Sequence, residues 1–151
     1  MDDREFIAQF EACTLPPSQF HHRNHVRLAW LYLKEAPLLD ALTRFRTSLQ
    51  RYAASLGAAA KYHETITFAF LFLIHERMQR ADAPSFDDFA DANAELFENI
   101  LGRYYSEEAL GSELARRVFV MPDLGVGRQA SGTSRLAAPV PSAATAQMPD
   151  A

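Results

Sequence analysis

Residues 62–78 form the stretch that most limits how this chain can fold. Within them, residues 65–74 (TITFAFLFLI) contain no charged residue, and Thr65 and Thr67 are the only polar members. A helix on a protein surface shows one apolar stripe, whereas a helix that is apolar almost all round is buried among other elements. We therefore expect residues 62–78 to form the central helix of a bundle.

Helical periodicity also appears on both sides of this stretch. Apolar residues recur at spacings of three and four in residues 3–13 and 38–56, as in helices that pack one face against a core. Residues 26–33 are apolar at nearly every position apart from Arg27, which predicts a second, largely buried helix. Serines followed by acidic residues predict further helices that begin near residues 85 and 106, with an interruption at Asn93. Alternating apolar and polar runs typical of strands are missing from the sequence. The predicted fold is an all-α, single-domain bundle of about five to seven helices.

Length and composition set the domain organisation. The chain has 151 residues, of which 48% are hydrophobic, and this is enough for one domain with a buried core. Residues 125–151 contain only four larger apolar side chains (Val126, Leu136, Val140 and Met148), too few to bury a core. We expect a helical domain over residues 1–124 and a disordered C-terminal tail.

Charge and hydropathy exclude two classes of partner. The net charge is −4 and basic residues form no cluster, which argues against binding of nucleic acid. The longest apolar stretch is about half the roughly 20 residues that a membrane-spanning helix needs. The single cysteine, Cys13, excludes an internal disulfide, and the acidic N-terminus resembles no targeting signal. We expect a soluble, cytoplasmic protein without a membrane partner, with a homodimer as an open alternative to a monomer.

Histidines gather at two predicted helix starts. His21, His22 and His25 precede or begin the second helix, and His63 lies at the start of the central helix. Residues three or four apart share one helix face, so His25 and one of its two neighbours can chelate a metal ion. If the two helix starts meet, His22, His25 and His63 form a three-histidine metal site. Imidazole ligands suit zinc, iron and copper alike.

Two residues beside His63 are candidates for catalysis. The carboxylate of Glu64 can act as a general base or orient a ligand imidazole, and the phenol of Tyr62 can donate a proton. Packing of the Tyr62 ring against its neighbours is the competing interpretation.

Two further residues are candidates for contact with a ligand or cofactor. Arg27 lies within an apolar helix, where it grips an anionic ligand, pairs with Glu64, or extends to the surface. Thr67 lies one turn after His63, where it lines the same pocket or bonds to the backbone carbonyl of His63. With Trp30 and Phe70, Thr67 would line a pocket for a small organic molecule.

Four segments carry a resemblance to a known type of protein. They are FHHRNHVRLAWLYL, KYHETITFAF, RYYSEEAL and ARRVFVMPDL, within residues 6–124. In these segments the chain resembles a small, functionally unassigned bacterial all-helical protein type with HHxxHVRLAW and YHETIT segments. The resemblance implies that residues 20–30 and 61–67 form one linked region, and it implies no activity.

Two functional interpretations remain open. In the first, the chain is a small metal-binding helical protein, with His22, His25 and His63 holding an iron, zinc or copper ion, and acts as a metal-dependent enzyme on a small organic substrate. In the second, it is a non-catalytic helical module that binds a small-molecule ligand or another protein. Its histidines are then helix caps and packing residues.

Overall fold

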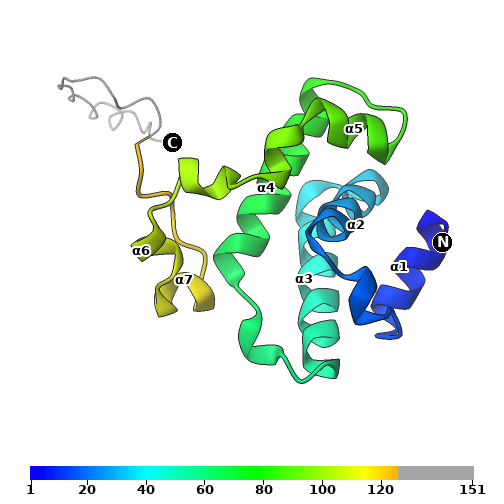
Figure 1. Ribbon diagram of the computed structural model, residues 1–151, viewed down its shortest axis with the longest axis horizontal. Helices are drawn as coiled ribbons and strands as arrows, with labels where there is room; N and C mark the ends of the chain where they lie inside the picture. Colours follow the sequence, from blue (N-terminus) through cyan, green and yellow to red (C-terminus); the bar gives the residue numbers. More distant parts are fainter. Residues whose placement is uncertain (126–151) are drawn as a thin grey trace, which may run out of the picture.

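The computed structural model describes residues 1–125, and every regular element in this part of the chain is helical (Figure 1). The α-helices are α1 (Asp3–Glu11), α2 (His22–Glu35), α3 (Leu38–Ser55), α4 (Glu64–Arg80), α5 (Phe86–Ala92), α6 (Glu107–Leu110) and α7 (Glu113–Arg117). Four short 3-10 helices join them: η1 (Pro17–Gln19), η2 (Ala59–Lys61), η3 (Ala94–Phe97) and η4 (Ile100–Arg103). The all-α prediction is confirmed. Apart from Gly125, the predicted tail lies outside the described residues.

The centre of the fold is a three-helix arrangement of α2, α3 and α4 (Figure 1). The charge-free stretch lies inside α4, where Leu71 and Ile74 are buried and Thr65 is completely inaccessible to solvent. Buried apolar side chains form one connected cluster from Phe6 to Tyr105. The prediction that this stretch is a buried central helix therefore agrees with its position.

Helix α4 begins two residues later than the sequence pattern suggested. Tyr62 and His63 have extended backbone conformations, and the His63 side chain accepts a hydrogen bond from the backbone N–H of Ile66. His63 is thus the N-cap of α4, and Glu64 is its first helical residue.

The chain after α4 is more broken than predicted. The interruption at Asn93 is present, because its side chain donates to the carbonyl oxygen of Phe89 and its backbone leaves the helical conformation. The predicted last helix is split into α6 and α7, since Ser112 caps a new helix by accepting from the N–H of Ala115. Residues 118–124 then form no helix, and hydrogen bonds hold them against Thr65 of α4 and against residues 104–106, just before α6.

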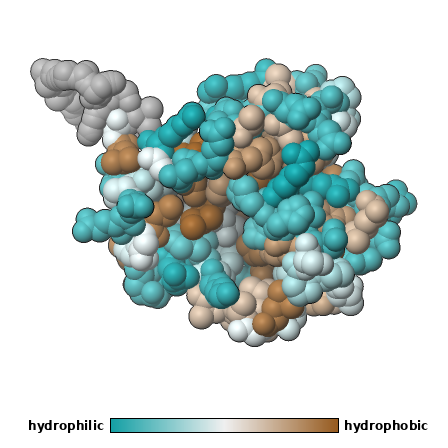
Figure 2. All heavy atoms as spheres, in the orientation of Figure 1, coloured by the Kyte–Doolittle hydropathy of each residue, from teal (hydrophilic) through white to brown (hydrophobic). Residues whose placement is uncertain are grey.

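The molecular surface is polar over most of the face in Figure 2, with hydrophobic patches, some of them next to α6 and α7. Exposed apolar side chains in that region include Leu114 and Met121. Within residues 1–125, no helix combines the length and the apolar character that crossing a lipid bilayer requires.

Candidate functional site

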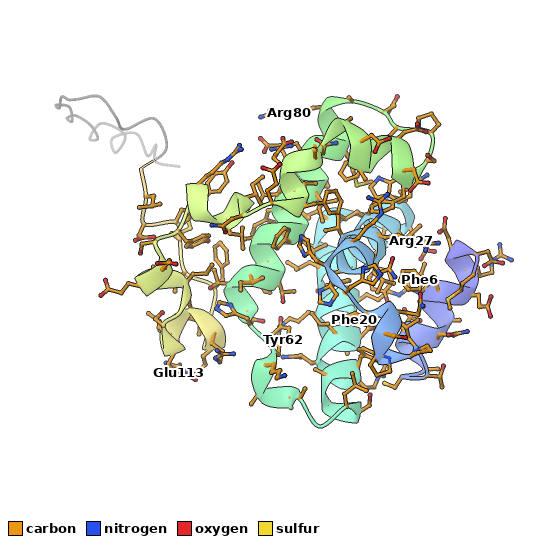
Figure 3. All side chains as sticks on the ribbon, viewed as in Figure 1. Phe6, Phe20, Arg27, Tyr62, Arg80 and Glu113 are labelled. Carbon is orange, nitrogen blue, oxygen red and sulfur yellow. The ribbon has the colours of Figure 1, made fainter. Side chains whose placement is uncertain are left out.

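A cavity of about 480 Å³ lies between α2, α3 and α4. Phe20, before α2, and the segment from Ala58 to His63, before α4, complete its wall. Figure 3 labels Phe20 and Tyr62, which come from these two connecting segments. The remaining wall is mainly apolar, with Phe45 and Leu49 from α3 and Phe70 from α4. The site is therefore an apolar chamber whose polar groups sit at the starts of two helices.

The three predicted metal ligands all line this one cavity. His22 and His25 come from the first turn of α2, and His63 comes from the cap of α4. The two helix starts meet because α2 and α4 pack against each other. Whether these side chains share an ion depends on which of their ring nitrogens are free.

His63 has both ring nitrogens engaged by the backbone. Its Nδ1 accepts from the N–H of Ile66 at 3.1 Å, and its Nε2 lies 2.7 Å from the carbonyl oxygen of Leu110. A carbonyl oxygen only accepts, so Nε2 carries the proton and donates. The imidazole is therefore a neutral bridge that caps α4 and ties it to α6.

His22 has one ring nitrogen engaged. Its Nε2 lies 2.9 Å from the carbonyl oxygen of Leu96, to which it donates. The ring packs edge-on against Phe70 and Phe97, with centroid distances of 5.3 and 5.9 Å. In this tautomer the Nδ1 of His22 keeps a lone pair, which can accept a hydrogen bond.

His25 differs from the other two histidines because neither ring nitrogen is hydrogen-bonded to another described residue. Its ring lies against Phe20, with the centroids 3.8 Å apart. Within residues 1–125, every side-chain nitrogen or oxygen that is fully shielded from solvent has a hydrogen-bond partner. The unpaired nitrogens of His25 are therefore not fully shielded, and a molecule in the cavity that His25 lines can reach them. Burial, followed by repulsion from His22 and His21, lowers the pKa of His25 to about 4. At neutral pH it offers one N–H donor and one lone pair.

The metal-ligand roles of His22, His25 and His63 stay a prediction. Within residues 1–125, no group of three or more His, Cys, Asp or Glu side chains is arranged to hold a metal ion. The hydrogen bonds explain this arrangement, because His63 and His22 direct Nε2 at carbonyl oxygens rather than at a shared point. Because both ring nitrogens of His63 are engaged, a three-histidine site needs one of the two His63 hydrogen bonds to be exchanged for a metal bond.

Tyr62 lines the cavity, and Glu64 supports it from outside the lining. The Tyr62 hydroxyl donates to Oε1 of Glu64 at 2.7 Å, and the same oxygen accepts from Nε of Arg46 at 2.7 Å. Burial acts to raise the pKa of Glu64, but hydrogen bonds from Arg46 and Tyr62 outweigh it and lower that pKa. Burial and the bond to Glu64 raise the pKa of Tyr62. At neutral pH the pair is a carboxylate and a neutral phenol.

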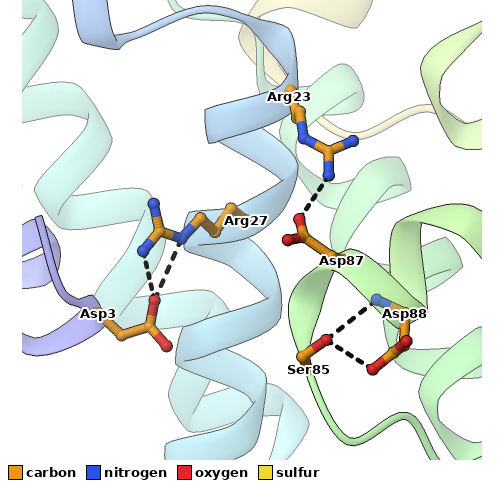
Figure 4. A network of polar contacts seen from close by, with 6 residues as sticks. All are labelled: Asp3, Arg23, Arg27, Ser85, Asp87 and Asp88. Carbon is orange, nitrogen blue, oxygen red and sulfur yellow. Dashed lines mark hydrogen bonds and ion pairs between the residues drawn. The ribbon is translucent and has the colours of Figure 1, made fainter.

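Arg27 lies outside the cavity lining and is engaged elsewhere. Its Nε donates to Asp3 at 3.2 Å (Figure 4). Its guanidinium group lies 4.6 Å from the centre of the Phe6 ring. The pairing with Glu64 that we considered from the sequence is therefore replaced by pairing with α1. Arg23, one turn earlier, pairs with Asp87 in the same view.

Thr67 and Phe70 line the cavity, whereas Trp30 does not. The Thr67 hydroxyl donates to the backbone carbonyl oxygen of His63 at 2.8 Å, the alternative role that the sequence suggested. Trp30 instead packs against Phe86 of α5, with the ring centroids 5.7 Å apart.

Sequence reasoning missed three contributors to the site, all of them on α3. Tyr52 and Ala53 of α3 line the cavity, although the apolar face of residues 38–56 was interpreted only as packing surface. Arg46 holds Glu64 in place from the same helix. The spacing of Tyr52 from Phe45, seven residues, was the available signal that both lie on one face.

The resemblance of residues 6–124 to a small bacterial all-helical protein type stays a prediction from the sequence. Comparisons of the chain with models of protein families, with curated proteins and with solved structures found no match.

Proposed function

We propose that this protein binds a small, largely apolar organic molecule in the cavity between α2, α3 and α4. The observation that supports the proposal most directly is the cavity itself, about 480 Å³ in volume, with aromatic and aliphatic walls and few polar groups. Small-molecule sites typically have volumes of about 300–1,000 Å³ and this kind of lining. An apolar cavity also lowers the stability of a protein that leaves it unfilled, so a ligand that fills it stabilises the fold.

The binding proposal is tested with an uncharged fluorescent probe, N-phenyl-1-naphthylamine, whose emission rises in apolar surroundings. We expect saturable binding to the parent protein and loss of binding in Ala53→Trp, because the indole ring occupies part of the cavity. The matched control is Ala54→Trp, since Ala54 is the next residue of α3 and is exposed. Absence of binding to the parent, or equal binding by both tryptophan variants, would contradict the proposal.

A metal-dependent enzyme is the second candidate, and one observation favours it. His22, His25 and His63 line the same cavity, and one nitrogen of His22 and both nitrogens of His25 are free of protein partners among the described residues. In that proposal Tyr62 donates a proton to the substrate, and Glu64 keeps the phenol oriented. An iron, zinc or copper ion would supply the reactive centre.

Metal analysis of protein purified without a histidine tag separates the two candidates. The enzyme proposal requires one ion per chain in the parent protein and loss of that ion in His25→Ala and His63→Ala. His75→Ala is the control, because His75 is not a cavity residue. Far less than one ion per chain in the parent would leave only the binding proposal. A cytoplasmic location and a homodimer remain predictions from the sequence.

A further inference from the structure

The hydrogen-bond donors on the cavity wall are almost all used within the protein. Tyr52 donates its hydroxyl proton to the carbonyl oxygen of Leu15 at 2.8 Å, and Tyr62 donates to Glu64. The donors of His22, His63 and Thr67 are directed at backbone carbonyl oxygens. Apart from the ammonium group of Lys61, which is on an exposed residue, the N–H of His25 is the one side-chain donor of the described lining left for a ligand.

Acceptors, in contrast, remain available along the same wall. The Nδ1 of His22 and the second ring nitrogen of His25 each keep a lone pair, and the hydroxyl oxygens of Tyr62 and Thr67 can each accept a further bond. A ligand with an O–H group finds partners for its proton here. A carboxylate is less suitable for two reasons. It would lose its hydration on entering the cavity, and its lone pairs would face the lone pairs of these acceptors.

The interior of the cavity also lacks a fixed charge. No aspartate, glutamate or arginine is among the described lining residues, and the one lysine among them, Lys61, is exposed. Glu64, which accepts a hydrogen bond from Tyr62, is already paired with Arg46. A cationic amine would therefore enter without a counter-charge, and an anion would meet only Lys61 at an exposed position.

The shape of the wall around His25 favours a ring. Phe20 packs against the His25 imidazole, and Phe45 and Phe70 line the same cavity from α3 and α4. Aromatic walls pack well against flat aromatic molecules through edge-on and offset contacts. We infer that the ligand is an uncharged aromatic alcohol whose hydroxyl group hydrogen-bonds to the imidazole of His25. This inference rests on the proposed binding function.

Calorimetric titration at pH 7 with naphthalene, 2-naphthol and 2-naphthoate tests this inference. One hydrogen bond made by a neutral group contributes about 1 kcal/mol, so we expect 2-naphthol to bind roughly fivefold more tightly than naphthalene. We expect 2-naphthoate to bind most weakly. In His25→Phe the preference for 2-naphthol over naphthalene should disappear, while naphthalene still binds. His21→Gln is the control, because His21 is exposed and lies outside the lining.

The possible failures are distinguishable. Equal affinity of the parent for naphthalene and 2-naphthol, or a preference that survives in His25→Phe, would overturn the role of His25 and leave the binding function intact. If 2-naphthoate binds most tightly of the three, the inference that the ligand is uncharged is wrong, and the site prefers an aromatic carboxylate. If none of the three probes binds, the proposed binding function fails as well.

Discussion

The hydroxyl group of Thr65 donates a hydrogen bond of 2.9 Å to the backbone carbonyl oxygen of Val118, 53 residues further along the chain. The hydroxyl oxygen of Thr65 in turn accepts from the backbone N–H of Val120 at 3.1 Å. Thr65 is completely buried, and this single side chain satisfies two backbone groups of residues 118–120. It fixes residues 118–120 against the first turn of α4.

Replacement of Thr65 by valine should therefore destabilise the fold. The variant keeps the side-chain shape but leaves a carbonyl oxygen and an N–H without their partner, at a cost of about 2–3 kcal/mol in the free energy of unfolding. Urea denaturation measures this loss, and hydrogen exchange should accelerate at residues 118–120.

Thr67→Val is the matched control for Thr65→Val. The Thr67 hydroxyl donates to the carbonyl oxygen of His63, which also accepts from the backbone N–H of Thr67. Its loss leaves no backbone group without a partner, and we expect a change below about 1 kcal/mol. Similar losses in the two variants would show that the contact with residues 118–120 contributes little.

His63 is expected to stabilise α4 as its N-cap. In His63→Ala the N–H of Ile66 and the carbonyl oxygen of Leu110 both lose a partner, and the free energy of unfolding should fall by about 1–2 kcal/mol. His63→Asn can cap the helix but is too short to bond Leu110 in the same way, so it should recover about half of the loss. An asparagine variant as unstable as the alanine variant would argue against the capping role.

His25 should make stability depend on pH in the range just below neutrality. Its pKa is about 4 in the folded protein, against an ordinary value of 6.5. Between these two values the unfolded chain binds a proton at His25, whereas the folded protein does not. The free energy of unfolding should decrease as the pH falls from 6.5 toward 4, by up to about 1.4 kcal/mol per pH unit. His25→Gln should show a shallower slope than the parent, whereas His21→Gln should retain the parent slope. An NMR titration of His25 with a midpoint above pH 6 would contradict this account.

The sequence predicted the fold better than it predicted the site, and the difference has a physical cause. The burial of α4 follows from ten successive residues without charge, which is local information. Which ring nitrogens of His22 and His63 are free to bind a metal depends on two backbone carbonyl oxygens. The partner of His22 is Leu96, 74 residues away, and the partner of His63 is Leu110, 47 residues away. No spacing rule reveals such partners.

Local signals were also present but outweighed by periodicity. Ser112 followed by Glu113 is a sequence typical of a helix start, and it divides the predicted helix over residues 106–120 into α6 and α7. The sequence placed the histidines at the starts of two helices, because signals for helix starts are local. Their meeting at one cavity depends on the packing of α2 against α4.

The contribution of the Glu64–Arg46 pair to stability should be lost in a lower pH range than the range in which His25 acts. Only 13% of the Glu64 side chain is exposed, and its folded-state pKa lies below the ordinary 4.5, so its contribution is present above about pH 4.5 and is lost as the pH falls through the folded-state value. Glu64→Gln should cost about 1 kcal/mol at pH 7, a modest value because Arg46 is 40% exposed. Below pH 4.5, Glu64→Gln should lose less stability than the parent.

The matched control is Glu76→Gln, whose bond to Arg80 joins two exposed side chains and should contribute less than about 0.5 kcal/mol. Urea denaturation at pH 7 and pH 3.5 compares the three proteins, and equal effects of the two substitutions would show that burial of Glu64 adds nothing to the pair.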